Sequence, residues 1–205
     1  MADHQMLHCY RYPALSLYKK DVLLKTVRER IAPDLIDIET EYCFYISISR
    51  PLHPEDHNTL RWLLAETFQP QQYADQSFFR QRDDSSSLVV EVGPRLNFST
   101  AWSTNAVSVC RAVGLTMIDR IERSRRFHLI FPRRNRALAF DKRAFLAFVH
   151  DRMTECEYSE PLTSFETGVV PEPVRLVPLL EQGKAALEKF NQSMGLGLDD
   201  WDIDY

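Results

Sequence analysis

The sequence is poor in the residues that build several common functional sites. It has only six glycines and no Gly-rich phosphate loop. Its four cysteines, Cys9, Cys43, Cys110 and Cys156, are far apart, so no Cys-x-x-Cys zinc motif exists. No window reaches the roughly 18 apolar residues of a membrane span, and residues 1–11 lack the apolar core of a signal peptide. We therefore expect a cytoplasmic protein that does not bind membranes.

The charge balance excludes a further class. The net charge is −4 and the pI is about 5.9, which argues against bulk binding to nucleic acid. Hydrophobic residues make up 44% and aromatic residues 11% of the chain, enough to build a folded core.

Hydrophobic periodicity predicts two successive β-α-β-α units. The first has strands at 6–12 and 36–49 and helices at 17–31 and 54–68. The second has strands at 88–94 and 118–131 and helices at 103–113 and 141–153, with Gly114 as a helix C-cap. The polar segment 69–87 reads as a linker with a short ordered piece around Phe78-Phe79.

The two units align without gaps when 83 is added to each number of the first unit. Apolar positions then fall on apolar positions: Leu7 on Val90, Val27 on Cys110, Ile38 on Ile121, Phe44 on Phe127 and Trp62 on Phe145. We interpret this as an internal duplication within residues 1–154, with halves at about 6–68 and 88–154. The predicted fold class is α+β, a mostly antiparallel sheet with helices packed on one face. The other face, polar in both long strands, is expected to meet solvent or another domain.

Residues 155–205 differ from the rest of the chain. Four of the eleven prolines lie between 155 and 178, which predicts an extended linker. A helix is expected at 179–194, and Asp199 and Asp200 resemble N-cap residues of a helix that barely starts. We expect a fragment cut at a domain boundary, with the linker and helix leading toward a missing part of the chain.

The densest local signal is the run Glu91–Val107, a strand, a Gly-Pro turn, a hydroxyl-rich loop and a helix start. Ser103, Thr104 and Asn105 could cap the helix, and free amides there could bind an anion. The residues alone favour an ordinary capped turn.

A second signal is a group of arginines that could bind phosphate or RNA. Acidic Asp119 and Glu122 lie among them and the arginines fall on both faces of a strand, so a solvated or interdomain face is the favoured interpretation. They are Arg120, Arg123, Arg125, Arg126, Arg133, Arg134 and Arg136.

Metal sites are not predicted. His53 and His57 have a four-residue spacing, but Pro54 places His53 at or before a helix start. The acidic residues at 199, 200, 202 and 204 could bind Mg²⁺, and helix-start electrostatics explains them equally well.

Several long motifs go further than composition. Glu91–Arg95, Ser99–Leu115, Asp119–Arg123, Gly183–Asn191 and Met194–Tyr205 resemble, in this order, the N-terminal part of the single-chain phosphoribosylformylglycinamidine synthase family. His150–Glu155 and Pro171-Glu-Pro173 also resemble it. The resemblance covers most of the chain.

The resemblance implies a non-catalytic N-terminal domain of an ATP-, Mg²⁺- and glutamine-dependent ligase of purine biosynthesis. Its partners would be the synthetase and glutaminase domains of the same chain, with roles in docking and in forming an ammonia channel. No catalytic residue and no cofactor is expected within these 205 residues, which should be inactive alone. The alternative is a stand-alone regulatory module that binds a small ligand. The matched residues that could face the active region are Arg95, Ser99, Thr100, Trp102, Ser103, Thr104 and Asn105.

Overall fold

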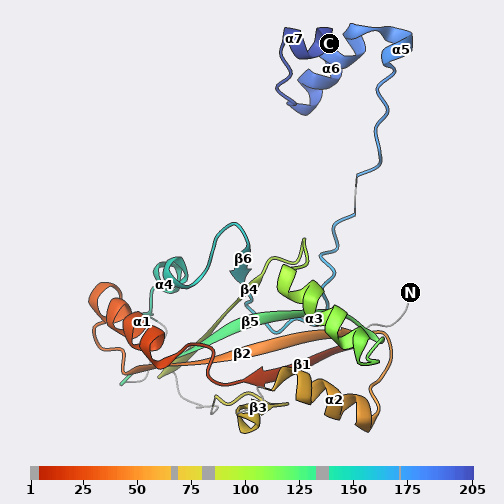
Figure 1. Ribbon diagram of the computed structural model, residues 1–205. Helices are drawn as coiled ribbons and strands as arrows, with labels where there is room; N and C mark the ends of the chain where they lie inside the picture. Colours follow the sequence, from red (N-terminus) through yellow and green to blue (C-terminus); the bar gives the residue numbers. More distant parts are fainter. Residues whose placement is uncertain (1–4, 66–68, 80–85, 133–138, 171) are drawn as a thin grey trace. The chain divides into compact units, whose positions relative to one another are not determined.

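The computed structural model describes residues 5–65, 69–79, 86–132, 139–170 and 172–205. The chain forms two compact units, Met1–Thr167 and Gly168–Tyr205 (Figure 1). The first unit therefore includes residues 155–167, the start of the segment that the sequence assigns to the linker. The functional boundary expected at residue 154 stays a prediction.

The first unit contains all eight long elements that the periodicity predicts. β3 and β6 were not predicted, because strands of two and three residues are too short to show alternation. The predicted end of the second helix, at Phe68, lies outside the described residues. The elements are β1 (Gln5–Arg11), α1 (Leu17–Arg30), β2 (Asp37–Ile48), α2 (Pro54–Leu64), the 3-10 turn η1 (Pro70–Gln72), β3 (Tyr73–Ala74), β4 (Ser87–Pro94), α3 (Ala101–Ala112), β5 (Ile118–Ile130), α4 (Lys142–Val149) and β6 (Glu155–Glu157).

One six-stranded sheet runs through the unit in the order β3-β1-β2-β5-β4-β6. Every pairing in it is antiparallel. The two long strands, β2 and β5, are the central pair, and each half of the chain adds its other strands outward from them (Figure 1). The predicted antiparallel α+β fold is confirmed.

The pairing of β2 with β5 reveals a pseudo-two-fold axis. Tyr42 pairs with Arg125, which is its own equivalent under the shift of 83 (42 + 83 = 125). On either side, Glu41 pairs with Arg126 and Cys43 pairs with Ser124. The axis therefore passes through the Tyr42–Arg125 pair at the middle of the sheet.

The outer strands follow the same symmetry with a small offset. Leu7 pairs with Ile46, whose equivalent in the second half is Leu129. Leu129 pairs with Leu88, not with Val90 as the ungapped alignment predicts. The shift between β1 and β4 is thus 81, and because it differs from 83 by two residues, each side chain keeps its face.

Helices α1 to α4 pack on one face of the sheet in two pairs (Figure 1). At one end, Leu60 of α2 and Val107 of α3 join a core that contains Ile121. At the other end, Val27 of α1 and Phe145 of α4 join a core that contains Ile38. Ile38 and Ile121 thus both lie on the helix-covered face, as the duplication predicts.

The prediction for the opposite face is wrong. The side chains of Glu41, Tyr45 and Ser124 are each no more than 1% exposed there, although the alternation suggested a surface facing solvent or another domain. The chain itself covers this face with residues 77–79 and with a strap, residues 156–165, that contributes Tyr158 to a third apolar cluster. Alternation identified the two faces but not what covers the second one.

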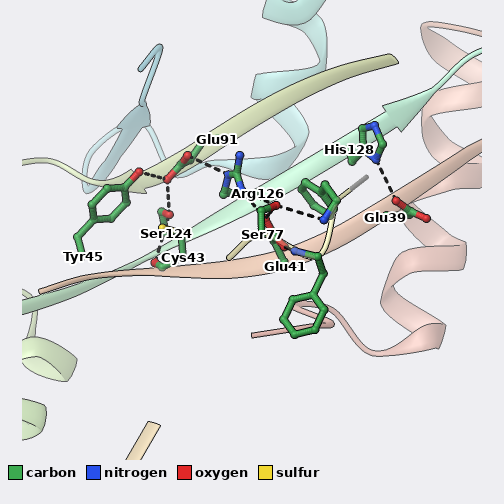
Figure 2. A network of polar contacts seen from close by, with 11 residues as sticks. Glu39, Glu41, Cys43, Tyr45, Ser77, Glu91, Ser124, Arg126 and His128 are labelled. Carbon is green, nitrogen blue, oxygen red and sulfur yellow. Dashed lines mark hydrogen bonds and ion pairs between the residues drawn. The ribbon is translucent and has the colours of Figure 1, made fainter. Parts of the chain in front are cut away.

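A polar network occupies this buried face (Figure 2). The register places Arg126 of β5 between Glu41 of β2 and Glu91 of β4. Arg126 pairs with Glu41 and lies 3.2 Å from Glu91. Glu91 also accepts hydrogen bonds from Tyr45 Oη and Ser124 Oγ, each at 2.6 Å. Burial of these charges is tolerated because each is paired or hydrogen-bonded.

The strap packs tightly against the sheet at Gly93 of β4. Tyr158 is 7% exposed, and its hydroxyl donates to the carbonyl of Pro94 at 2.5 Å. A Cβ atom on Gly93 would lie 2.5 Å from two ring carbons of Tyr158 and 2.8 Å from its hydroxyl. Only glycine leaves room for this ring.

We therefore expect Gly93→Ala to lower the free energy of unfolding by about 1–3 kcal/mol through overpacking. Denaturant unfolding of Gly93→Ala in the wild-type and Tyr158→Ala backgrounds measures this. The alanine should cost little once the ring of Tyr158 is gone. An equal cost in both backgrounds would show that the contact with Tyr158 is not the cause.

The second unit contains α5 (Leu179–Gln182), α6 (Lys184–Met194) and α7 (Asp200–Asp204). The sequence predicts one helix over 179–194, but Gly183 interrupts it with φ 64° and ψ −158°, a conformation that side chains disfavour. Asp199 caps α7 by accepting from the amide of Asp202 at 2.9 Å, as predicted. None of the helices in the described ranges has the length and apolar character that crossing a membrane requires.

Candidate functional site

The loop of residues 95–100 and the first turn of α3 form the region that the sequence singles out. The helix begins at Ala101 because Thr100 caps it, its hydroxyl accepting from the amide of Ser103 at 3.0 Å. The predicted cap at Ser103, Thr104 or Asn105 is therefore wrong. Within Thr-Ala-Trp-Ser, the capping residue is Thr100, three residues before Ser103, the first of the expected caps.

A carboxylate of the chain already lies at this helix start. Glu122 of β5 is 1% exposed and accepts from the amide of Thr100 at 3.1 Å and from its hydroxyl at 2.8 Å. The helix start that the sequence offers to an external anion thus binds an internal one. Glu122 lies in the Asp119–Arg123 motif, which was the sequence signal for it.

Arg120 of β5 holds the loop through hydrogen bonds. Its guanidinium donates to Glu122 at 3.0 and 3.1 Å and to the carbonyl oxygens of Leu96, at 3.4 Å, and Phe98. It also lies 4.5 Å from the ring centre of Phe165, a residue of the strap. Sheet, loop and strap are therefore joined through one side chain. Sequence reasoning missed Phe165, because it lies in the apparent linker.

Two of the predicted site residues serve the fold. Trp102 is half-buried, packs on the core shared by α2 and α3, and has its ring centre 5.9 Å from that of Phe44. Ser103 is 1% exposed. A change at either residue would disturb packing as well as any contact outside the domain.

The other predicted residues lie at the surface. Ser99, Thr104 and Asn105 are exposed, and exposed Arg95 donates to the carbonyl of Arg152 at 2.8 Å. A shallow hollow of about 290 Å³ adjoins them. It is lined by Ser99, Ser103, Thr104, Val107, Ser108, Arg111, Asp119 and Arg120. This hydroxyl-rich surface stands on a rigid support, as residues that make outside contacts often do.

The arginine group is divided between the two faces of β5. Arg120 and Arg126 lie on the strap-covered face and form the ion pairs already described, whereas Arg123 and Arg125 lie on the helix side. Arg133, Arg134 and Arg136 lie outside the described residues. The group is therefore not a single basic surface.

The cysteines do not resemble nucleophiles. Cys9 and Cys110 are buried, and burial raises the pKa of both thiols, that of Cys9 to about 11. Burial likewise raises the pKa of Cys43 and Cys156. A reactive thiol requires the opposite shift.

Residues 41–164 match the family described as formylglycinamide ribonucleotide amidotransferase N-terminal. The match covers more than half of the 205 residues, including the loop, α3 and Glu122. The chain belongs to this family. The resemblance seen in the sequence motifs is thereby confirmed, since the N-terminal domain is the part it implied.

Curated relatives agree with the family match. A probable phosphoribosylformylglycinamidine synthase of Arabidopsis thaliana, named chloroplastic/mitochondrial, is 44% identical over 203 residues, 98% of this chain and 14% of the relative. Phosphoribosylformylglycinamidine synthases of Dictyostelium discoideum and Homo sapiens are 41% and 42% identical, over 95% and 84% of this chain. The matched part of this chain corresponds to 14% and 13% of the length of these two relatives. The chain thus spans about one seventh of the relatives it matches.

Proposed function

We propose that the chain is the non-catalytic N-terminal domain of a phosphoribosylformylglycinamidine synthase. In this proposal it docks onto the synthetase and glutaminase domains of that enzyme and contributes to the path of ammonia between them. The observation that carries it is the family match, together with relatives about seven times as long as the chain. A stand-alone regulatory module would not need so large a remainder.

The surface formed by residues 95–105 supports this proposed role. The loop of residues 95–100 is held by Glu122 and Arg120, so its exposed polar residues Asn97 and Ser99 stand on a fixed backbone. A fixed polar surface loses little conformational entropy when a partner binds. The second unit adds exposed apolar side chains, among them Val174, Leu176 and Leu180, that a partner domain could cover.

We assign ATP, Mg²⁺ and the glutamine chemistry to the other domains, as the resemblance implies. Within the described ranges, no three His, Cys, Asp or Glu side chains are grouped to hold a metal ion. The proposal gives this domain no metal-dependent step, and the 205-residue chain should be inactive alone.

Arginine substitutions at two symmetry-related helix positions test the docking surface. In the full-length synthase, Asn105→Arg on α3 should reduce glutamine-dependent synthesis by about tenfold, because it inserts a bulky charge into the contact. Val22→Arg on α1 is the matched control, since 22 + 83 = 105 and both residues are exposed. Synthesis with ammonia in place of glutamine shows whether the transfer path is affected.

Both arginine variants should melt within a few degrees of the wild type, since surface changes alter stability by about 0.5 kcal/mol or less. If Val22→Arg and Asn105→Arg lower the rate equally, or neither does, the surface formed by the loop and the start of α3 is not the docking surface.

A further inference from the structure

The outer edge of β1 is only partly paired, because β3 pairs with just the last two residues of β1. Beyond the strand, the amide of Tyr12 donates to the carbonyl of Gln72 at 2.9 Å, toward the β3 side. Backbone N–H and C=O groups of a strand point to alternate sides, so those of His8 also face this side. Within the described part of the chain, no strand pairs with this side of residues 5–9. Such an edge can accept a further strand.

A hollow of about 500 Å³ lies along the unpaired stretch. It is lined by three consecutive residues of β1, Leu7, His8 and Cys9. Since successive side chains of a strand point to opposite faces, a hollow that contacts three in a row adjoins the edge of the strand. It is also lined by α2, which lies beside β1 (Figure 1), and by Tyr73 and Asp75. The hollow, named the β1 groove below, therefore lies where a further strand would pair.

The charges in the β1 groove favour an acidic partner. Arg61 of α2 is exposed and lies over the ring of Tyr73, 5.8 Å from its centre. It forms no ion pair with any carboxylate in the described ranges. His57, one helical turn earlier, is exposed and adds a second N–H donor to the lining. The acidic residue of the lining, Asp75, has its Oδ1 4.0 Å from Sγ of Cys9.

We propose that an extended acidic segment of the same synthase polypeptide, from beyond residue 205, adds a strand to β1 in this groove. Its backbone pairs with the N–H and C=O of His8, and a Glu or Asp side chain contacts Arg61. The family match is to an N-terminal part, and the relatives are about seven times as long as the chain. A segment of the same polypeptide also has a high effective concentration at the groove.

This inference rests on the proposed function, but it uses a different surface from residues 95–105. The two can therefore fail separately. If Asn105→Arg lowers glutamine-dependent synthesis while the β1 groove stays empty in the full-length enzyme, the docking surface stands and the groove proposal is wrong. If the groove is filled while Asn105→Arg has no effect, the reverse holds.

Amide hydrogen exchange in the 205-residue chain and in the full-length synthase tests whether the groove is filled. The N–H of His8 should exchange at least about a hundredfold more slowly in the enzyme, where it is hydrogen-bonded. Val89 of β4 is the matched control, since it is the equivalent of His8 under the shift of 81 (8 + 81 = 89). Its N–H should exchange equally in both proteins. No slowing at His8, or equal slowing at both amides, would overturn the proposal.

Arg61→Glu in the full-length synthase tests the acidic chemistry of the partner. It should accelerate exchange at His8 by about tenfold, because like charges then meet in the groove. Arg143→Glu, at an exposed arginine of α4, is the control and should leave this exchange unchanged. Equal effects of the two variants, or slower exchange in Arg61→Glu, would contradict an acidic partner.

A photo-crosslinking residue at position 58, which is exposed and lines the groove, identifies the occupant. Mass spectrometry of the crosslinked full-length enzyme should find an acidic peptide of the same polypeptide from beyond residue 205. Crosslinking to a second copy, or to residues within 1–205, would reject this source.

Two variants of His8 separate backbone pairing from side-chain contacts. His8→Pro removes the N–H at a strand edge, where proline is tolerated, and should lower the crosslinking yield by about tenfold. His8→Ala loses the same contact of Nε2 with the carbonyl of Leu162, at 2.9 Å, but keeps the N–H, so its yield should match the wild type. Equal yields in both variants would contradict strand addition. If His8→Pro does not fold, Arg61→Glu and Arg143→Glu make the corresponding comparison.

Discussion

Replacing Arg126 with methionine should lower the free energy of unfolding by about 3–5 kcal/mol, because it leaves two buried carboxylates without their shared cation. The side chains of Glu41 and Glu91 are 0% and 8% exposed, and that of Arg126 is 17% exposed. Burial opposes the charge of Arg126, but both carboxylates outweigh it and raise its pKa. Methionine fills a similar volume, so the loss would report charge rather than a cavity.

The pH dependence of this loss identifies its origin. Burial raises the pKa of Glu41, and Arg126 counteracts that shift. Without Arg126 the folded-state pKa rises further above the unfolded value of about 4.3. A carboxyl with a raised pKa contributes stability below its unfolded pKa and loses it as the pH rises through the folded pKa. The deficit of Arg126→Met should therefore shrink as the pH falls from about 7 to about 5.

Two further variants serve as controls, with urea unfolding as the measurement. Arg125→Met removes the neighbouring arginine, whose pair with Glu155 is 29% and 24% exposed, and should cost about 1 kcal/mol or less. Adding Glu41→Gln to Arg126→Met should restore part of the stability. Equal losses in the two arginine variants, or a deficit that does not change with pH, would contradict this account.

The network also shows which structural features could not be predicted from the sequence. Alternation in β2 placed Ile38 and Ile46 on one face and Glu41 and Tyr45 on the other, and the structure confirms both assignments. The second face is covered in part by Tyr158. In the sequence, Tyr158 lies at least 113 residues from Glu41 and Tyr45 (158 − 45 = 113). No local pattern encodes a contact at that separation.

The duplication was predictable for a different reason. Core residues of β2 and β5 at a shift of 83, such as Ile38 and Ile121, share burial and face. The pairing of Tyr42 with Arg125 is a direct consequence of two equal halves meeting about an axis. The shift of 81 between β1 and β4 was not predictable, since an ungapped alignment cannot detect two residues lost where loops differ.

The candidate site was located by its motif but assigned the wrong internal roles. The hydroxyls after Trp102 suggested a cap and an open anion site, whereas Thr100 caps the helix and Glu122 fills its start. Four hydroxyl residues, Ser99, Thr100, Ser103 and Thr104, lie near the same turn, and local sequence alone does not decide which one caps it. The exposed positions Thr104 and Asn105 remain the part of the site that a partner can reach.

Glu122→Ala should cost about 3–5 kcal/mol of unfolding free energy, since it leaves the guanidinium of Arg120 buried without its carboxylate. The Glu122 side chain is 1% exposed and that of Arg120 is 17% exposed. Nη2 of Arg120 lies 3.0 Å from Oε1 of Glu122. The loss should also be local: amide hydrogen exchange should accelerate first at residues 96–103, because Glu122 is what ties Thr100 to the sheet. Glu122→Gln keeps one acceptor for Thr100 and should lose less than the alanine variant.

The internal symmetry supplies the matched control. Glu39 is the equivalent of Glu122 in the first half (39 + 83 = 122), but its side chain is 36% exposed. Its partner is His128, whose Nδ1 lies 2.9 Å from Oε2 of Glu39. Glu39→Ala should therefore cost about 1 kcal/mol or less. If the two alanine variants unfold with the same free energy, or if Glu122→Ala leaves exchange at residues 96–103 unchanged, Glu122 does not hold the loop. The rigid support that the docking proposal requires would then be absent.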